Sequence, residues 1–125
     1  MTGSLDIGFA SVTKSDFQLL RGWLANDHVR EWWADPESQL ASIRAKVEGR
    51  DTTRPFIFSV NGEPTGYIQY WTVRNALAAG YGSDEAWLCD LPEDAVGVDL
   101  FIGRGGLLDK GIGTAVLRAF LAELF

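Results

Sequence analysis

A glycine-rich segment near the carboxyl end is the clearest candidate for ligand chemistry in this 125-residue chain. It reads Gly103-Arg-Gly-Gly-Leu-Leu-Asp-Lys-Gly-Ile-Gly113 and lies between a strand-like stretch and an apolar, helix-like stretch. Glycines let backbone N–H groups approach an anion closely, and a helix amino terminus adds partial positive charge. Lys110 could add a charge contact and Thr114 a hydroxyl. The segment therefore predicts a phosphate or pyrophosphate site, with a simple tight turn as the alternative.

Two nucleotide motifs fit this segment poorly. A Walker loop needs two glycines separated by four residues and a lysine directly after the second glycine. Gly106 and Gly111 have this spacing, but the residue after Gly111 is Ile112. A dinucleotide fingerprint needs a third glycine where Val116 stands after Gly111-Ile-Gly113. The glycines therefore favour neither of these nucleotide-binding folds.

Asp99 is the candidate for acid–base or ammonium-binding chemistry. It stands in the middle of the apolar run from Val96 to Ile102, just before the glycine segment. An isolated carboxylate is costly to bury without a partner. Asp99 therefore either faces solvent in the strand alternation or has a functional partner.

Further acids and aromatic residues surround this candidate in the sequence. From Asn75 to Gly103 the chain has no Lys or Arg and holds six acids, Asp84, Glu85, Asp90, Glu93, Asp94 and Asp99. They form either a solvated acidic loop or the mouth of a site that attracts a cation. Four tryptophans could form a flat wall for a sugar ring, and core packing is the alternative for Trp32, Trp33, Trp71 and Trp87. His28 is expected to be a surface or helix-end residue.

The amino-terminal half must supply a strand and helices that support these residues. Hydrophobic spacing predicts a strand at 7–12, a helix carrying Phe17, Leu20 and Leu24, a short helical turn at 28–33 and an amphipathic helix at 37–48.

The second half begins with the strongest local signal. Strand-like runs at 55–60 and 65–71 flank Asn61-Gly62, a pair that favours the positive φ angles of a tight hairpin turn. A long loop is expected from Asn75 to Pro92, then a strand at 96–102 and a helix to Phe125. This order predicts an α+β fold in a single domain, 1–125, with a mostly antiparallel sheet flanked by helices.

Composition excludes several classes of function. The formal net charge of −6 argues against nucleic acid and against anionic membranes as partners. No apolar run is long enough to span a bilayer. The single cysteine, Cys89, cannot form an internal disulfide, so a reducing cytoplasm is expected as the location. No metal ligands are assigned.

Four motifs together resemble the GNAT superfamily of N-acetyltransferases, and most closely its aminoglycoside 6′-N-acetyltransferase branch. They occur in that family's order and approximate spacing, namely Glu31-Trp-Trp33, Asn61-Gly-Glu-Pro-Thr-Gly-Tyr67, Gly97-Val-Asp-Leu-Phe-Ile102 and Lys110-Gly-Ile-Gly-Thr114. The resemblance covers nearly the whole chain. Leu108 departs from the superfamily's usual Gln or Arg, although the aminoglycoside branch tolerates an apolar residue there. Asp109 suits a pyrophosphate only if it points outward.

The resemblance implies acetyl-coenzyme A as cosubstrate and a small polycationic amine as acceptor. Asp99 would then hold the substrate ammonium and take up its proton, and Leu100, Phe101 and Ile102 would offer backbone groups to the pantetheine arm. The pyrophosphate would lie against Leu107, Leu108, Asp109, Lys110, Gly111, Ile112, Gly113 and Thr114. Substrate contacts are expected from Trp33, Tyr70, Asp84, Glu85, Trp87 and Asp99.

Members of that family continue past the last helix into a further strand, a helix and a closing hairpin. The resemblance therefore implies a GNAT-like fold whose C-terminal strands and helix are missing, which a homo-oligomer could complete. Three functions stay open: acetylation of an aminoglycoside-like polycation, acyl transfer to a small metabolite, polyamine or siderophore precursor, and a non-catalytic domain that binds coenzyme A or antibiotic.

Overall fold

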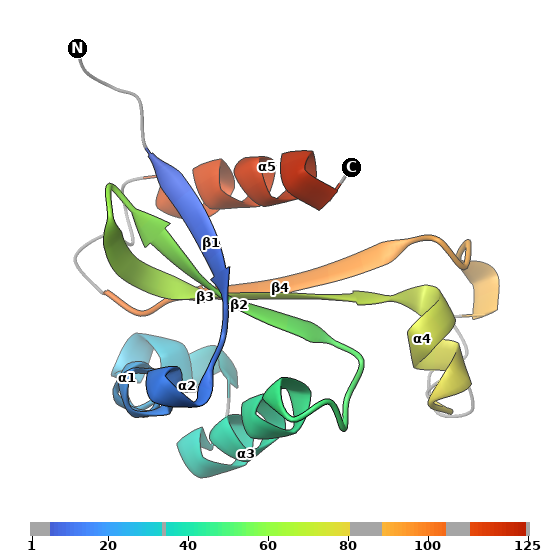
Figure 1. The fold of residues 1–125 in the computed structure, drawn as a ribbon, viewed down its shortest axis with the longest axis horizontal. Helices are drawn as coiled ribbons and strands as arrows, with labels where there is room; N and C mark the ends of the chain where they lie inside the picture. The colour runs from blue at the N-terminus through green and yellow to red at the C-terminus, as the bar shows by residue number, and fades with distance from the viewer. Residues whose placement is uncertain (1–5, 34, 81–88, 105–110, 125) are drawn as a thin grey trace.

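The computed structural model describes residues 6–33, 35–80, 89–104 and 111–124. Its sheet contains β1 (Ile7–Ser11), β2 (Arg54–Val60), β3 (Glu63–Thr72) and β4 (Val96–Ile102), which lie side by side in chain order. All three neighbouring pairs run antiparallel. The predicted α+β class, with an antiparallel sheet flanked by helices, is therefore confirmed (Figure 1).

The hairpin between β2 and β3 turns where the sequence predicts it. Asn61 and Gly62 adopt φ angles of 53° and 86°, as both central residues of a type I′ turn must. Asn61 also pairs with the chain ahead of β1, because its Oδ1 accepts from Asp6 N at 3.0 Å and its N donates to Asp6 O at 2.7 Å. Local turn chemistry thus determines the first pairs of the hairpin, and an irregularity between Phe58 and Ser59 shifts the register of the pairs beyond them.

The helices form two layers, one on each face of the sheet. A 3-10 turn, η1 (Lys14–Asp16), leads into α1 (Phe17–Leu24), and this helix lies with α2 (Asp27–Trp33) and α3 (Pro36–Val47) on one face. The last helix, α5 (Ile112–Leu124), covers the other face (Figure 1). Side chains alternate along each strand, so Tyr67 packs in the core below α1–α3 and Ile68 in the core below α5.

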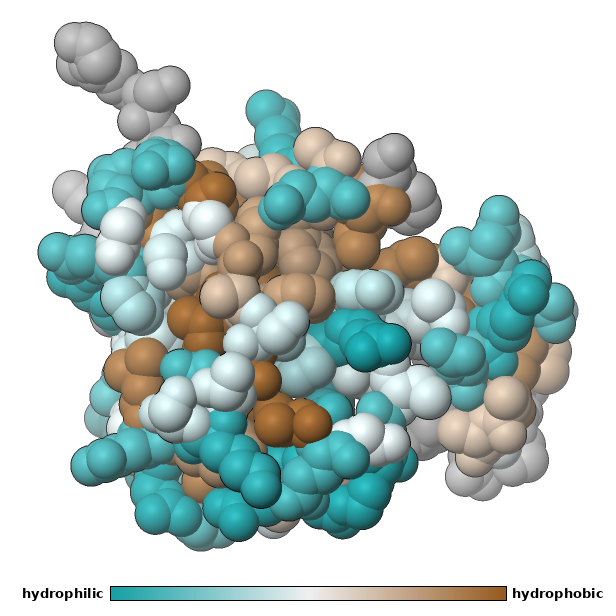
Figure 2. Space-filling view, viewed as in Figure 1, coloured by the Kyte–Doolittle hydropathy of each residue, from teal (hydrophilic) through white to brown (hydrophobic). Residues whose placement is uncertain are grey.

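The two cores differ in how completely they are covered. The core below α1–α3 contains fully buried residues such as Leu20, Leu24 and Ile43. The core below α5 is flanked by partly buried residues, among them Phe9 and Phe56. Figure 2 shows apolar surface between α5 and the sheet on the face drawn. Among the described residues, α5 is the helix that covers this sheet face, and it leaves side chains such as Phe9 and Phe56 only partly buried.

One element departs from the sequence prediction. The chain forms α4 (Val73–Ala78) where a loop was expected from Asn75 onward, so that prediction is wrong for 75–78. Thr72 Oγ1 caps the helix by accepting from Asn75 N at 3.1 Å. Val73 N and Arg74 N donate to Ala95 O and Glu93 O, which ties α4 to the start of β4. Residues 81–88 of the expected loop lie outside the described residues.

No described helix combines the length and the apolar character that crossing a bilayer would require.

Candidate functional site

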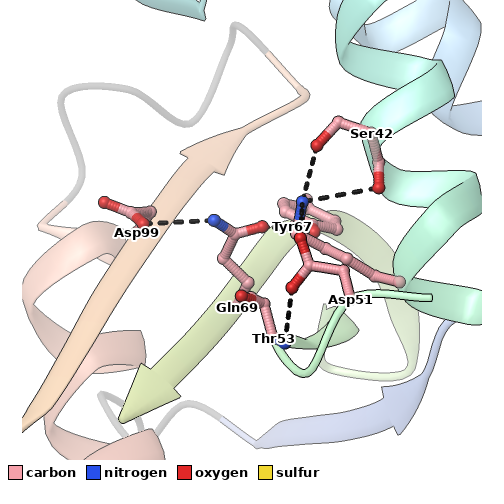
Figure 3. Close-up of polar contacts among 7 residues, drawn as sticks. Ser42, Asp51, Thr53, Tyr67, Gln69 and Asp99 are labelled. Atoms are coloured by element: carbon pink, nitrogen blue, oxygen red, sulfur yellow. Dashed lines mark hydrogen bonds and ion pairs between the residues drawn. The ribbon is translucent and has the colours of Figure 1, made fainter. Parts of the chain in front are cut away.

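Asp99 lies on the sheet face that α1–α3 cover, beyond the edge of their core. Its register partner on β3 is Gln69, and the two side chains reach toward each other (Figure 3). Gln69 Nε2 donates to Asp99 Oδ2 at 3.1 Å. The Asp99 carboxylate is exposed to solvent and also has a defined hydrogen-bond partner. The two alternatives that the sequence left open for Asp99, a side chain that faces solvent and one that has a partner, therefore do not exclude each other.

Tyr67 determines which way the Gln69 amide points. The Tyr67 hydroxyl donates to Gln69 Oε1 at 2.6 Å, and the tyrosine is fully buried. Burial raises the pKa of Tyr67 far above its usual range, and the carboxylates of Asp99 and Asp51 raise it further. The hydroxyl therefore stays protonated and donates, which requires the amide oxygen to face Tyr67 and the amide nitrogen to face Asp99.

An open cavity of about 420 Å³ lies beside this hydrogen-bonded row. Its wall comes from α3, the segment after α3, β3, α4 and β4, and consists of Ser42, Lys46, Arg50, Asp51, Thr52, Thr53, Gln69, Trp71, Asn75, Ala76, Ala79 and Asp99. The described wall thus carries two acids and two bases. It can accept hydrogen bonds from an ammonium group at Asp99, and Lys46 and Arg50 add positive charge to the same wall.

Lys46 is the most buried charged side chain among the wall residues that the sequence analysis did not single out. Its side chain is only 8% exposed, and Nζ donates to Ser42 Oγ at 2.7 Å and lies 3.9 Å from Asp51 Oδ2. Burial lowers the pKa of Lys46, and the carboxylates of Asp51 and Asp99 partly offset that effect. A signal existed: Lys46 stands three residues after inward-facing Ile43, next to the buried face of the helix.

Two aromatic residues predicted to contact substrate occupy different faces of the sheet. Trp33 packs its ring edgewise on Phe101 at 5.1 Å between centroids and lines a shallow pocket of about 490 Å³ together with Gln69 and Asp99. Tyr70 instead stacks on Phe56 at 6.2 Å in the core below α5. The packing of α2 on the sheet therefore brings Trp33 near Asp99, whereas strand alternation places Tyr70 on the opposite face. Asp84, Glu85 and Trp87 lie outside the described residues.

Exposed Trp32 also lines the shallow pocket. Its side chain is 81% exposed and comes from α2, directly beside half-buried Trp33. An aromatic ring that faces solvent at a pocket rim can lie flat against a sugar or contact a cation. Of the two adjacent tryptophans, one is thus mainly structural and the other is free to meet a ligand.

The acidic stretch contributes less to this cavity than its composition suggests. Asp90, Glu93 and Asp94 are exposed and precede β4, and none of them lines the cavity. Glu93 Oε2 lies 3.8 Å from Arg74 Nη2, so its charge is shared with a cation. Exposed pairs of this kind contribute at most about 1 kcal/mol.

The edge of β4 that faces away from β3 has no neighbouring strand within the described residues. Gly103 N donates to Thr65 O, at the point where the strand pairing continues past Ile102. In an antiparallel pair alternate residues bond to the partner strand, so Leu100 and Ile102 turn their backbone groups to the open edge and Phe101 turns its own toward β3. The open edge can therefore pair with an extended ligand.

The described end of the glycine segment leads directly into α5. Gly111 has a φ angle of +69° and its carbonyl accepts from Ala115 N at 3.2 Å. The first N–H groups of a helix lack intrahelical partners, so Ile112, Gly113 and Thr114 can offer theirs to an anion. Thr114 is exposed, and a side chain added at Gly113 would meet nothing within 4 Å. Leu107, Leu108, Asp109 and Lys110 lie outside the described residues.

Residues 12–125 match the acetyltransferase (GNAT) domain family. Two curated relatives from Klebsiella pneumoniae and Serratia marcescens, both named aminoglycoside N(6′)-acetyltransferase type 1, are 31% identical over 121 aligned residues. The alignment covers 91% of this chain and 57% of each relative, so the chain spans a little over half of their length.

Solved structures agree with that match. Aminoglycoside acetyltransferase AAC(6′)-Ib in complex with coenzyme A superposes with a TM-score of 0.76 at 30% identity, covering 96% of this chain and 68% of that one. The same enzyme with coenzyme A and kanamycin gives a TM-score of 0.76 at 31% identity, with 96% and 67% covered. Fold, motif order and family match coincide, and the chain therefore belongs to the GNAT acetyltransferase domain family.

Proposed function

We propose that this chain carries the amine site and part of the coenzyme A site of an N-acetyltransferase that acts on an aminoglycoside-like polycationic amine. The observation that carries the proposal is Asp99, oriented by Gln69 at a cavity wall, one and three residues from the backbone groups of Leu100 and Ile102 on the open edge of β4. The solved AAC(6′)-Ib structures with coenzyme A and with kanamycin support this assignment by similarity.

Asp99 would hold and deprotonate the acceptor amine. Since Gln69 engages Oδ2, Oδ1 is the natural acceptor for the substrate ammonium. Transfer requires an unprotonated amine whose nitrogen forms a bond to the acetyl carbon while the carbon–sulfur bond breaks. Of the two protons that the ammonium loses, one passes to Asp99 and the other accompanies the leaving thiolate.

The residues present fit a bound acetyl-coenzyme A, which supplies the thioester whose acetyl group is transferred. Leu100 and Ile102 would meet the pantetheine arm along the open edge of β4, and a backbone N–H there would steady the oxyanion. The N–H groups of Ile112, Gly113 and Thr114 would meet the pyrophosphate at the start of α5. Ile112 can contribute only its backbone, because its side chain is buried.

A small metabolite amine with a single cation is the second candidate acceptor. The observation that favours it is the presence of Lys46 and Arg50 in the cavity wall, where their charges would repel additional ammonium groups. Both cations have acidic neighbours, Asp51 and Glu48, which reduces that repulsion. A reducing cytoplasm as location and a homo-oligomer that completes the fold stay predictions.

Mass spectrometry of the acceptor tests the proposal. Kanamycin and, in parallel, tyramine, an amine with a single cation, are incubated with acetyl-coenzyme A and the purified chain, with chain-free and Asp99→Asn reactions as controls. Singly acetylated kanamycin that depends on the chain and on Asp99 is the expected result. Acetylated tyramine alone would transfer the proposal to the second candidate, and no product from either amine would contradict it.

A further inference from the structure

The junction between α1 and α2 reaches across the fold to the end of β4. Asn26 Nδ2 donates to Gly103 O at 2.9 Å, and His28 Nε2 donates to Ile102 O at 2.7 Å. Both contacts are partly buried and join residues more than seventy positions apart. We call these two residues the β4 clamp. The sequence predicted His28 as a surface or helix-end residue, and it does lie in the first turn of α2 with its ring turned inward.

Contacts other than the β4 clamp also fix the backbone around Gly103. A Cβ at Gly103 would lie 2.2 Å from the ring of buried Trp23, so only glycine fits there. Gly103 N and Arg104 N both donate to Thr65 O, and Arg104 forms an ion pair with Glu63. The position of the backbone from Ile102 to Arg104 is therefore determined by β3 as well as by the clamp.

His28 occupies a backbone group that would otherwise belong to the open edge of β4. Ile102 turns its carbonyl to that edge, and a carbonyl that already accepts a 2.7 Å hydrogen bond is a poor partner for a further strand-like ligand. Asn26 occupies the carbonyl of Gly103, the first residue past the end of β4. The edge that remains for pairing therefore consists of the backbone groups of Val98 and Leu100 and the N–H of Ile102.

We propose that His28 and Asn26 are positioning residues for coenzyme A, because they end the open edge of β4 and so set the register of the cofactor's amide-bearing arm. The inference rests on the proposed coenzyme A site and adds to it two residues that touch neither the amine nor the reacting atoms. Loss of the clamp frees the carbonyl of Ile102, which then competes for the cofactor's amide groups at the open edge. Cofactor binding is weakened, while the amine site around Asp99 and Gln69 is left in place.

Isothermal titration with coenzyme A measures this effect without any acetyl transfer. The unchanged chain is compared with His28→Phe, which keeps a ring without a donor, and with His28→Gln, whose amide can place a donor near the former Nε2. Loss of one partly buried hydrogen bond predicts a dissociation constant about three- to tenfold higher for His28→Phe. His28→Gln is expected to recover about half or more of the lost affinity, on the same scale. Asn26→Asp, which presents an acceptor to Gly103 O, is expected to weaken binding as well.

A KM-against-kcat comparison separates positioning from general damage. The clamp variants are expected to raise KM for acetyl-coenzyme A with little change in kcat or in KM for the amine. Thr72→Ala is the matched control, since it removes one hydrogen bond that caps α4, far from the clamp. It should lower the thermal midpoint and leave coenzyme A affinity unchanged.

The outcomes are distinguishable. The inference would be overturned if folded His28→Phe and Asn26→Asp bound coenzyme A with unchanged affinity. It would also be overturned if Thr72→Ala lost as much coenzyme A affinity as the clamp variants. Either result would leave the proposed function standing. If His28→Phe does not fold, Asn26→Asp and His28→Gln decide by the same criterion. If the unchanged chain itself fails to bind coenzyme A, the proposed function is contradicted and the inference falls with it.

Discussion

Gln69 Nε2 donates to Asp99 Oδ2 across neighbouring strands at 3.1 Å, and the same amide accepts from buried Tyr67. A fully buried hydroxyl thus orients an exposed carboxylate through one side chain. The donor and acceptor roles allow one amide orientation only. The row explains how a carboxylate on an exposed strand position can be held still enough to meet a substrate.

The first prediction concerns this row. Gln69→Leu removes the donor to Asp99, and KM for the amine is expected to rise about tenfold or more, the value of one hydrogen bond to a charged group. Tyr67→Phe leaves Gln69 in place but removes the hydrogen bond that fixes its orientation. The expected rise in KM for the amine is therefore smaller than for Gln69→Leu. Steady-state kinetics with the amine varied would check both. A Tyr67→Phe effect as large as that of Gln69→Leu would show that Tyr67 acts through stability instead.

The second prediction concerns the charge of Asp99. Asp99→Asn keeps the shape of the side chain, removes the charge and the proton acceptor, and is expected to lower kcat/KM about a hundredfold or more. Asp51→Asn is the matched control because Asp51 lines the same cavity but pairs with Lys46. Acetylation rates of the two variants check this assignment. Equal losses in both would mean that general cavity charge, and not Asp99, drives the reaction.

The third prediction follows from the buried ammonium of Lys46. In the folded chain, burial lowers the pKa of Lys46 below the ordinary 10.5, whereas in the unfolded chain the pKa stays near 10.5. At pH values between the folded and the unfolded pKa, Lys46 therefore binds more protons in the unfolded chain than in the folded one. Stability from this group therefore rises with pH across that window. The Lys46→Met variant lacks the titration, and other groups cancel in the comparison. Thermal midpoints should show the unchanged chain gaining on Lys46→Met as pH approaches 10.5, and a constant difference would contradict the lowered pKa.

The fourth prediction separates two glycines at the start of α5. Gly111 has a φ angle of +69°, so Gly111→Val strains the backbone by about 1–2 kcal/mol whatever it does to a ligand. Gly113 has open space and no such φ, so Gly113→Val tests the anion site alone. Coenzyme A titration should show at least about tenfold weaker binding for Gly113→Val with an unchanged thermal midpoint. Undiminished binding would remove the helix start from the cofactor site.

The fifth prediction tests how α5 is attached to the sheet. Phe120 is 3% exposed and packs its ring against Phe9 and Phe56 at centroid distances of 5.0 and 5.5 Å. Phe120→Ala is expected to lower the free energy of unfolding by about 3–5 kcal/mol. Leu121→Ala, at a position 36% exposed, should cost less than half as much. Urea unfolding measures both, and similar losses would show that α5 packs in another rotation.

Several features could be predicted from the sequence because they are local. Asn61-Gly62 determines the hairpin through its own φ preferences, and apolar spacing identifies α1, α3 and α5. The short helix α4 was missed because six residues carry too little periodicity to stand out from a glycine- and acid-containing stretch. The four motifs, read in order, predicted the family that the comparisons confirm.

Other features depend on which segments meet in space, and no local pattern records them. Asp99 was recognisable as a candidate, but its pairing with Gln69 required the register of β3 on β4, and the same register places Tyr70 on the opposite face. His28 and Ile102 lie 74 positions apart, and only the packing of α2 against the sheet brings the imidazole to that carbonyl. The sequence by itself determined every described strand, the helices other than α4, the family and the residue types able to do chemistry. The tertiary structure decided which of them share a face, because hydrogen bonds between distant residues form only where the packed core places their partners within reach.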